Sequence, residues 1–159
     1  MAIREVRLNG DEILRKKARE VEVVDDRIKE LLEDMLDTMH KFDGVGLAAP
    51  QVGILKRVIV IDLYDGNPPL KLVNPEIIKE KGTQEVDEGC LSFPNQYAKV
   101  VRPKEVTVTA LNENGERVKI VAKDLLAQAL SHEVDHLNGI LFTDKMEPGT
   151  LEYIEPKDS

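Results

Sequence analysis

Residues 132–136 carry the pattern most able to do chemistry, because they read His-Glu-Val-Asp-His. Two histidines four residues apart lie one above the other on the same face of an α-helix, so both imidazoles can reach a single cation. Glu133, between them, is placed to take a proton from water that the cation activates. The segment therefore predicts a metal centre on a helix, with His132 and His136 as ligands.

Cys90 is the natural third ligand, because the chain has one cysteine and three histidines. It lies in residues 88–92, Glu-Gly-Cys-Leu-Ser, where Gly89 removes side-chain bulk beside the thiol. A lone cysteine is more often a small buried apolar residue, but here a histidine pair lacks a third ligand. A Cys/His/His set leaves one tetrahedral position open, as a catalytic site needs.

The surroundings of the histidine pair predict a helix over residues 124–137. Asp124 can cap its start, and Asn138 with Gly139 supplies a stop. Two adjacent imidazoles on a packed helix face need polar partners, which a shared metal provides. Apolar residues recur between these limits at helical spacing, and they are Leu125, Leu126, Ala129, Leu130, Val134 and Leu137.

Length and composition predict a single domain, residues 1–159, in the cytoplasm. The chain is 42% hydrophobic and 33% charged, with a net charge of −8. This charge argues against binding to DNA or to anionic membranes, while a local contact with the ribosome stays open. One cysteine cannot form an internal disulfide, and we find neither a signal peptide nor an apolar run of membrane-spanning length.

The rest of the pattern predicts an α+β fold, in which largely antiparallel β-sheets pack around a central helix carrying the His-Glu-x-x-His motif in the C-terminal half of the chain. Residues 26–41 form an amphipathic helix, capped by Asp25 or Asp26, and residues 11–17 form a short helix. The predicted strands cover residues 57–63, 71–74, 77–79, 100–101, 105–111, 116–121 and 140–142.

The loop after the first helix, residues 44–51, reads Gly-Val-Gly-Leu-Ala-Ala-Pro-Gln. Two glycines around one residue let the backbone approach a ligand closely. A plain helix-to-strand connection explains the loop equally well, and a Walker-type phosphate loop is excluded because the Lys-Ser/Thr ending is missing. Gln51 ends the run with an amide that can donate a hydrogen bond within a site.

With these segments in order, the chain resembles peptide deformylase, the family of hydrolases that removes the formyl group from the N-terminal methionine of new bacterial polypeptides. The family's three motifs correspond to residues 44–51, 88–92 and 132–139. The resemblance runs nearly end to end and includes residues 10–15 and Arg102. Arg102 and Asp135 are candidates for orienting the ligands, with partners that the sequence does not name.

Two features depart from the family pattern. Ser131 stands where the family usually places Gln, which puts the rigidity of the site or its metal affinity in doubt rather than the reaction. The tail from Asp144 to Ser159 is acidic, so we do not expect the C-terminal helix by which some relatives dock on the ribosome.

The resemblance implies one divalent metal held by Cys90, His132 and His136. Ligand types alone would favour zinc. The family implies ferrous iron as the physiological metal, with zinc, nickel or cobalt able to occupy the site.

Catalytic roles follow from the same resemblance. Glu133 would accept a proton from the attacking water and deliver it to the departing amine. The Gln51 side-chain amide and the Leu91 backbone N–H would stabilise the oxyanion.

N-formylmethionyl peptides are the implied substrates. The backbone at Val45 and Gly46 would pair with an extended peptide as an added strand does, and Gly89 would lie beside it. On the helix, a pocket for the methionine side chain should lie along the side of the histidines, at Leu125, Gln128 and Ala129.

Two alternatives remain. The first is a zinc endopeptidase of the His-Glu-x-x-His type with Glu155 as third ligand, although only 23 residues follow His136 to position it. The second is a non-enzymatic, structural Cys/His/His site with a fourth protein ligand, which would show no hydrolysis.

Overall fold

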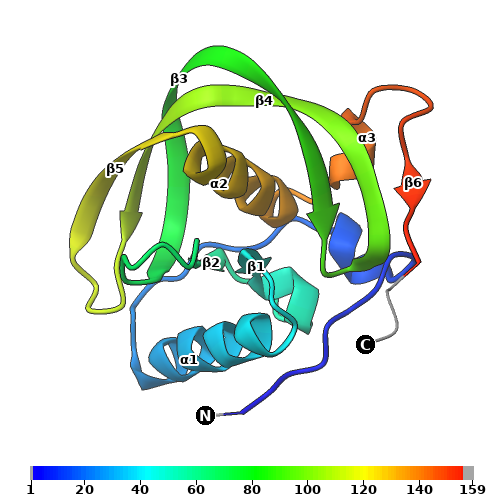
Figure 1. The fold of residues 1–159 in the computed structure, drawn as a ribbon. Helices are drawn as coiled ribbons and strands as arrows, with labels where there is room; N and C mark the ends of the chain where they lie inside the picture. Colours follow the sequence, from blue (N-terminus) through cyan, green and yellow to red (C-terminus); the bar gives the residue numbers. More distant parts are fainter. Residues whose placement is uncertain (1, 156–159) are drawn as a thin grey trace.

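The computed structural model describes residues 2–155, and these form the expected α+β fold. Figure 1 shows a curved sheet arching over one helix, with a second helix beneath. The elements follow the order η1 (Glu12–Arg15), α1 (Asp26–Lys41), β1 (Gly46–Ala48), η2 (Ala49–Val52), β2 (Val58–Ile61), β3 (Leu70–Cys90), β4 (Phe93–Leu111), β5 (Arg117–Lys123), α2 (Asp124–Leu137), α3 (Phe142–Lys145) and β6 (Glu152–Tyr153).

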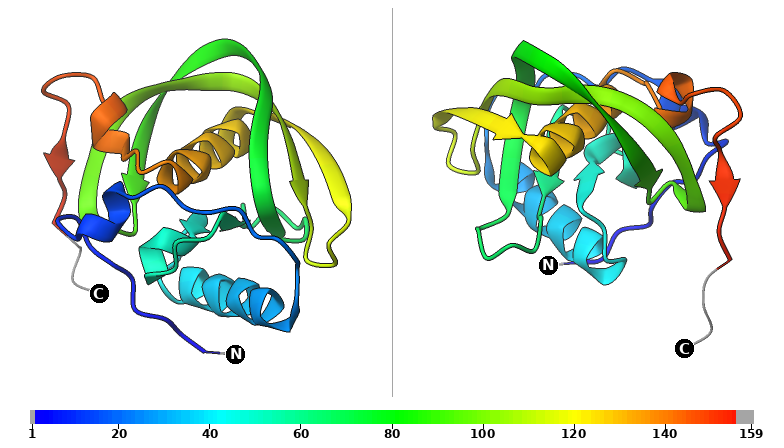
Figure 2. Two further views of the ribbon diagram at one scale, coloured as in Figure 1. Left: turned by 180° about the vertical axis from the view of Figure 1, so that it is seen from behind. Right: turned by 45° about the horizontal axis from the view of Figure 1, so that its top comes forward.

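The sheet is antiparallel throughout residues 2–155, with strand order β1-β2-β3-β4-β5 and β6 attached to β4. β3 and β4 are long strands joined by a tight turn at Leu91 and Ser92. Their pairing shifts register three times, the last time between Gly89 and Cys90. Such irregularities bend strands, and both views in Figure 2 show this hairpin curving around α2.

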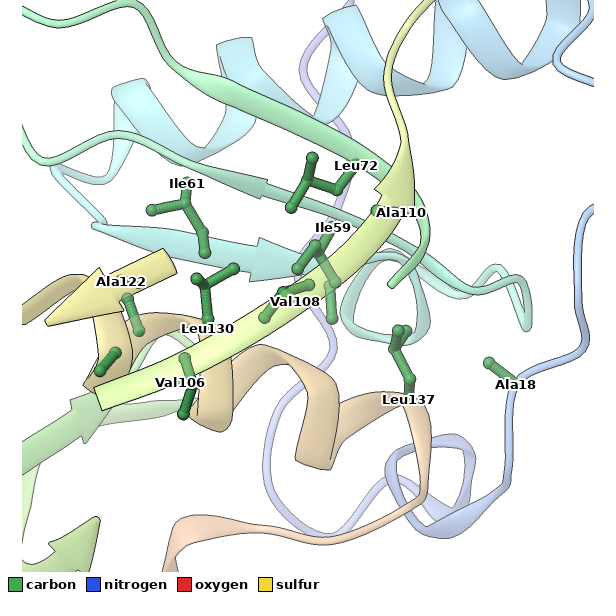
Figure 3. Close-up of a cluster of buried hydrophobic side chains, with 13 residues drawn as sticks. Ala18, Ile59, Ile61, Leu72, Val106, Val108, Ala110, Ala122, Leu130 and Leu137 are labelled. Atoms are coloured by element: carbon green, nitrogen blue, oxygen red, sulfur yellow. The ribbon is translucent and has the colours of Figure 1, made fainter. Parts of the chain in front are cut away.

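α2 packs its apolar residues against the inner face of the sheet. Leu130 is fully buried in a cluster with Ile61 from β2 and Val108 from β4, and Figure 3 shows its side chain between them. Because β2 and β4 both contact α2 through these residues, burying the apolar side of the helix also fixes the direction in which its histidines point.

α1 spans the residues predicted for it, 26–41, and its predicted cap is confirmed. The Asp25 side chain accepts a hydrogen bond from Ile28 N at 3.0 Å. The apolar stripe of α1 packs on the other side of β1 and β2, where Leu32 and Met35 are fully buried. This packing holds the loop that follows α1 next to α2.

The strands predicted at 71–74 and 77–79 are parts of one strand, β3, which continues through Pro75. Proline cannot donate a ladder hydrogen bond and is tolerated at bulges. Here it falls within the register shift between Val73 and Glu76, where regular pairing is interrupted.

The strand predicted at 140–142 is wrong, because Phe142 begins the short helix α3. Leu141 N donates to the Asp144 side chain at 2.9 Å, which starts a helical turn. Phe142 is buried against Phe93, with ring centroids 4.9 Å apart. A short apolar run does not distinguish a strand from a buried turn of helix.

The cap predicted at Asp124 is also wrong. Lys123 occupies the N-cap position, and Asp124 is the first residue of α2, with a positive φ of 53°. Its carboxylate lies 3.4 Å from Lys104 Nζ on β4, so the side chain faces a neighbouring strand.

Replacing Leu32 by alanine tests the packing of α1 on the sheet. We expect Leu32→Ala to lower the free energy of unfolding by about 2–5 kcal/mol, because it leaves a cavity in a closed core. Urea denaturation followed by circular dichroism measures this, with the exposed Val23→Ala as control. Equal denaturation midpoints for the two variants would contradict the described packing.

Candidate functional site

Cys90, His132 and His136 converge at one point, with ligand atoms within 4.8 Å of one another. Cys90 Sγ lies 3.3 Å from His136 Nε2, and the two histidine Nε2 atoms are 3.1 Å apart. Ligands at ordinary N and S distances around one tetrahedral cation are separated by about 3.3–3.6 Å. The spacing therefore suits a single shared ion.

Strand β3 and helix α2 bring these ligands together. Cys90 is the last residue of β3, where the strand turns into β4. His132 and His136 lie one turn apart in the second half of α2, and both are buried. The curved hairpin carries its end down to the helix, so ligands 42 residues apart in sequence meet.

The Glu88 carboxylate fixes the proton on His132. Burial alone would raise the pKa of Glu88, but hydrogen bonds from His132 and Arg102 outweigh it and hold that pKa below its usual value. An ionised carboxylate can only accept, so His132 Nδ1 must donate to Glu88 Oε1. In the neutral imidazole the lone pair would then lie on Nε2, which faces the other ligands.

His136 is also suited to bind a metal, because burial lowers its pKa well below the ordinary value and keeps the imidazole neutral. Neutral imidazole is the form that binds a metal. Without a metal these three atoms can satisfy one another only by sharing protons, whereas a cation between them would use a lone pair of each. The residues present therefore fit a divalent metal.

Arg102 on β4 is a fully buried cation that connects the strand and the helix that carry the ligands. Its Nε and Nη2 atoms each donate to Glu88 at 2.9 Å, and Nη1 donates to Asp135 at 2.6 Å. Lys145 on α3 also lies 2.9 Å from Asp135. This network connects β3, β4, α2 and α3 around the ligand His132.

Glu133 lies beside the ligands with few polar partners. Its carboxylate is buried against Gly46, where any Cβ would collide with it, and Oε2 is 3.9 Å from His132 Nε2. Burial raises the pKa of Glu133 to about 7. A carboxyl group with such a pKa can both take up and release a proton near neutral pH.

The amide of Gln51 is held next to the thiol. Its Oε1 accepts from Ala48 N at 3.0 Å, while Nε2 donates to Ser92 Oγ at 3.0 Å and to Cys90 Sγ at 3.3 Å. Leu91 follows Cys90 in the turn. Both predicted oxyanion donors thus belong to residues that adjoin the ligand set.

A cavity of about 1100 Å³ opens beside the ligands, although Gln51 and His136 are not among its lining residues. Cys90, His132 and Glu133 line it, as does Leu91. The residues predicted to bind substrate line the same cavity, and they are Val45, Gly46, Gly89, Leu125, Gln128 and Ala129.

Glu88 was missed as a functional residue, although it lies within a recognised motif. Residues two apart on a strand point to the same face, so Glu88 and Cys90 could have been placed together once the strand was drawn through both. Ser92, which accepts from the Gln51 amide, gave no such signal.

The ligand set disfavours both alternatives. Glu155 is exposed and follows β6, outside the group of converging ligand atoms. Across residues 2–155, no fourth Cys, His, Asp or Glu joins that group. One coordination position is therefore left for water or substrate.

Comparison with known proteins now decides the family. The sequence model described as Polypeptide deformylase matches residues 3–151. The chain belongs to the polypeptide deformylase family. This membership confirms the resemblance and the expected class of metallohydrolase.

Individual polypeptide deformylases are similar to this chain over most of their length. Peptide deformylase 2 of Clostridium acetobutylicum is 59% identical over 145 residues, covering 91% of this chain and 95% of the relative. The crystal structure of the Legionella pneumophila enzyme matches with a TM-score of 0.89 at 47% identity, covering 92% of this chain and 88% of that one. The crystal structure of the Thermotoga maritima enzyme matches with a TM-score of 0.89 at 42% identity, covering 93% of this chain and 100% of that one.

Membrane insertion through a helix finds no support in the described part of the chain: none of its helices combines the length and apolar character that crossing requires.

Metal content tests the ligand set. After anaerobic purification, we expect about one divalent ion per chain in the parent and in Glu155→Gln, and a strong loss in Cys90→Ser, because the thiolate is one of three ligands. Elemental analysis measures the content, and circular dichroism confirms that each variant folds. Metal loss in Glu155→Gln with retention in Cys90→Ser would support the endopeptidase alternative instead.

Proposed function

We propose that this chain removes the N-formyl group from the N-terminal formylmethionine of nascent polypeptides and releases formate. The observation that carries the proposal is the meeting of Cys90, His132 and His136 beside Glu133, at the base of an open cavity. Family membership supplies the substrate class, because the curated relatives are peptide deformylases.

The three ligands would hold one divalent cation, which lowers the pKa of water to about 7 in favourable cases and polarises a carbonyl oxygen. Resemblance to the family favours ferrous iron as the physiological ion. Zinc, nickel and cobalt are alternative occupants, since imidazole and thiolate suit each of them.

Glu133 moves the proton. In the proposed reaction, water adds to the formyl carbon as Glu133 takes one of its protons, and the C–N bond then breaks. Glu133 delivers that proton to the departing nitrogen, which leaves as the free amine of methionine. Its raised pKa of about 7 supports both transfers at neutral pH.

Gln51 and Leu91 would stabilise the negative charge that develops on the formyl oxygen. The Gln51 amide is held by Ala48 and Ser92, and its second N–H, which meets Cys90 Sγ at 3.3 Å, is the one that would turn to the oxyanion as charge develops. We assign the Leu91 backbone N–H as the second donor. Losing one donor of this kind typically costs about 10²–10³ in kcat.

The peptide would bind along β1, whose partner in the described sheet is β2 on one side. An edge strand presents unpaired backbone groups to an extended chain. Val45 and Gly46 would pair with the substrate backbone, and Gly89 would adjoin it. Backbone pairing tolerates varied sequences, as an enzyme acting on many nascent chains requires.

The methionine side chain would lie along α2. Leu125, Gln128 and Ala129 precede His132 by one to two turns and line the cavity, so a side chain entering beside Glu133 would contact them.

The proposed setting is the cytoplasm, with residues 1–159 acting as one catalytic domain. A net charge of −8 favours neither DNA nor an anionic membrane as partner. Encounter with nascent chains at the ribosome would need a local basic contact.

Formate release from a formyl-Met peptide tests the proposal, using protein purified without oxygen. We expect turnover in the parent that a chelator abolishes. Glu133→Gln should keep its metal and lose about 10²–10⁴-fold in kcat, because the proton carrier is gone. The matched control is the exposed Glu30→Gln. Near-normal turnover by a metal-loaded Glu133→Gln would remove Glu133 from the reaction.

A further inference from the structure

We propose that the N-terminal strap, residues 2–8, is an extended subsite that binds the substrate residues following formylmethionine. The proposal rests on the proposed function and adds a specificity determinant to it. It concerns the wall of the cavity that Ile3, Leu8 and residues between them form.

Buried polar groups of α1 fix the first half of the strap. Asp34 Oδ1 accepts from Ala2 N at 2.7 Å, and Asp34 Oδ2 accepts from Arg4 Nε and Nη2 at 3.0 and 2.8 Å. Arg4 N donates to Thr38 Oγ1 at 2.8 Å. Asp34 and Thr38 are buried on α1, and buried polar groups are costly without such partners. The strap therefore has a defined path.

The second half of the strap, and Asn9 directly after it, are attached to the segments that carry the catalytic groups. Arg7 N donates to the Gln51 carbonyl at 2.6 Å, and Asn9 N donates to the Ser92 carbonyl at 2.8 Å. Figures 1 and 2 show the dark-blue N-terminal segment passing α1 toward the turn between β3 and β4. A wall built in this way keeps a constant position relative to the metal ligands.

The strap lines the cavity with apolar Ile3, Val6 and Leu8, and with Arg4 and Glu5. Arg4 is paired with Asp34, so the unpaired apolar side chains make up most of the surface offered to a ligand. Ile3 is 48% exposed and Leu8 is 52% exposed, and both line the cavity. Phe42 and Tyr97, from the loop after α1 and from β4, line it too and are similarly exposed. Exposed apolar side chains gathered around a cleft indicate a surface that is covered when a ligand binds.

The size and continuity of the cavity identify the occupant as the substrate's own chain. One cavity of about 1100 Å³ reaches from His132 and Glu133 to the strap. Sites for drug-sized ligands occupy about 300–1,000 Å³, so this one has room for more than one formylated residue. Apolar contact is non-directional, which suits downstream residues of varied sequence.

The ratio of kcat/KM for formyl-Met-Ala-Leu-Leu to that for formyl-Met-Ala tests the subsite. We expect the parent to prefer the longer peptide. In the double variant Ile3→Ser/Leu8→Ser the ratio should fall about tenfold, mainly through KM of the longer peptide, because two apolar contacts are lost. The matched control, Val23→Ser/Ile78→Ser, removes two exposed apolar side chains outside the cavity and should keep the parental ratio.

An unchanged ratio in the strap variant would overturn the subsite. If both peptides then lost kcat/KM equally, the strap would act only through the Gln51 segment. An equal fall in the control variant would also overturn it. Absence of formate release from both peptides in the metal-loaded parent would instead contradict the proposed function, so the two failures are distinguishable.

Discussion

The hydrogen bond between Glu88 and His132 is the contact on which the rest of the site depends. It joins the strand that ends in Cys90 to the helix that carries both histidines, and it sets the tautomer of His132. Hydrogen bonds from His132 and Arg102 hold the pKa of Glu88 below its usual value, although burial alone would raise it. Removing the cation would leave two buried acidic groups, Glu88 and Asp135, without their common partner, a change that is typically far costlier than breaking a surface pair.

Different residues of the same elements stabilise the fold and carry the chemistry. The apolar residues of α2 pack on the sheet, while its histidine face meets the cavity. Gly46 permits Glu133 to lie against β1, since a side chain there would collide with the carboxylate. The N-terminal segment then joins α1 to the Gln51 and Ser92 segments, because its backbone N–H groups donate to the Asp34 side chain on α1 and to the carbonyl oxygens of Gln51 and Ser92. Each chemical group is thereby held by at least one element that is itself packed in a core.

Much of the site was predictable, because its strongest signals are local. A four-residue histidine spacing and a single cysteine name the ligands without knowledge of the fold, and the apolar period of residues 26–41 determines α1. Features that depend on distant partners were not predictable in this way. Pro75 interrupts the pattern of β3 but fits an irregularity in its pairing with β4, and the turn at Phe142 depends on packing against Phe93. The role of Glu88 and the anchoring of the strap by Asp34 likewise require contacts that span 30 residues or more.

X-ray absorption at the metal edge, on protein purified without oxygen, tests the central claim most directly. Convergence of Cys90, His132 and His136 predicts one sulfur and two imidazole nitrogens around the ion, with a light-atom ligand in the remaining position. A spectrum without a sulfur neighbour, or one with a fourth protein ligand in place of the open position, would contradict the account.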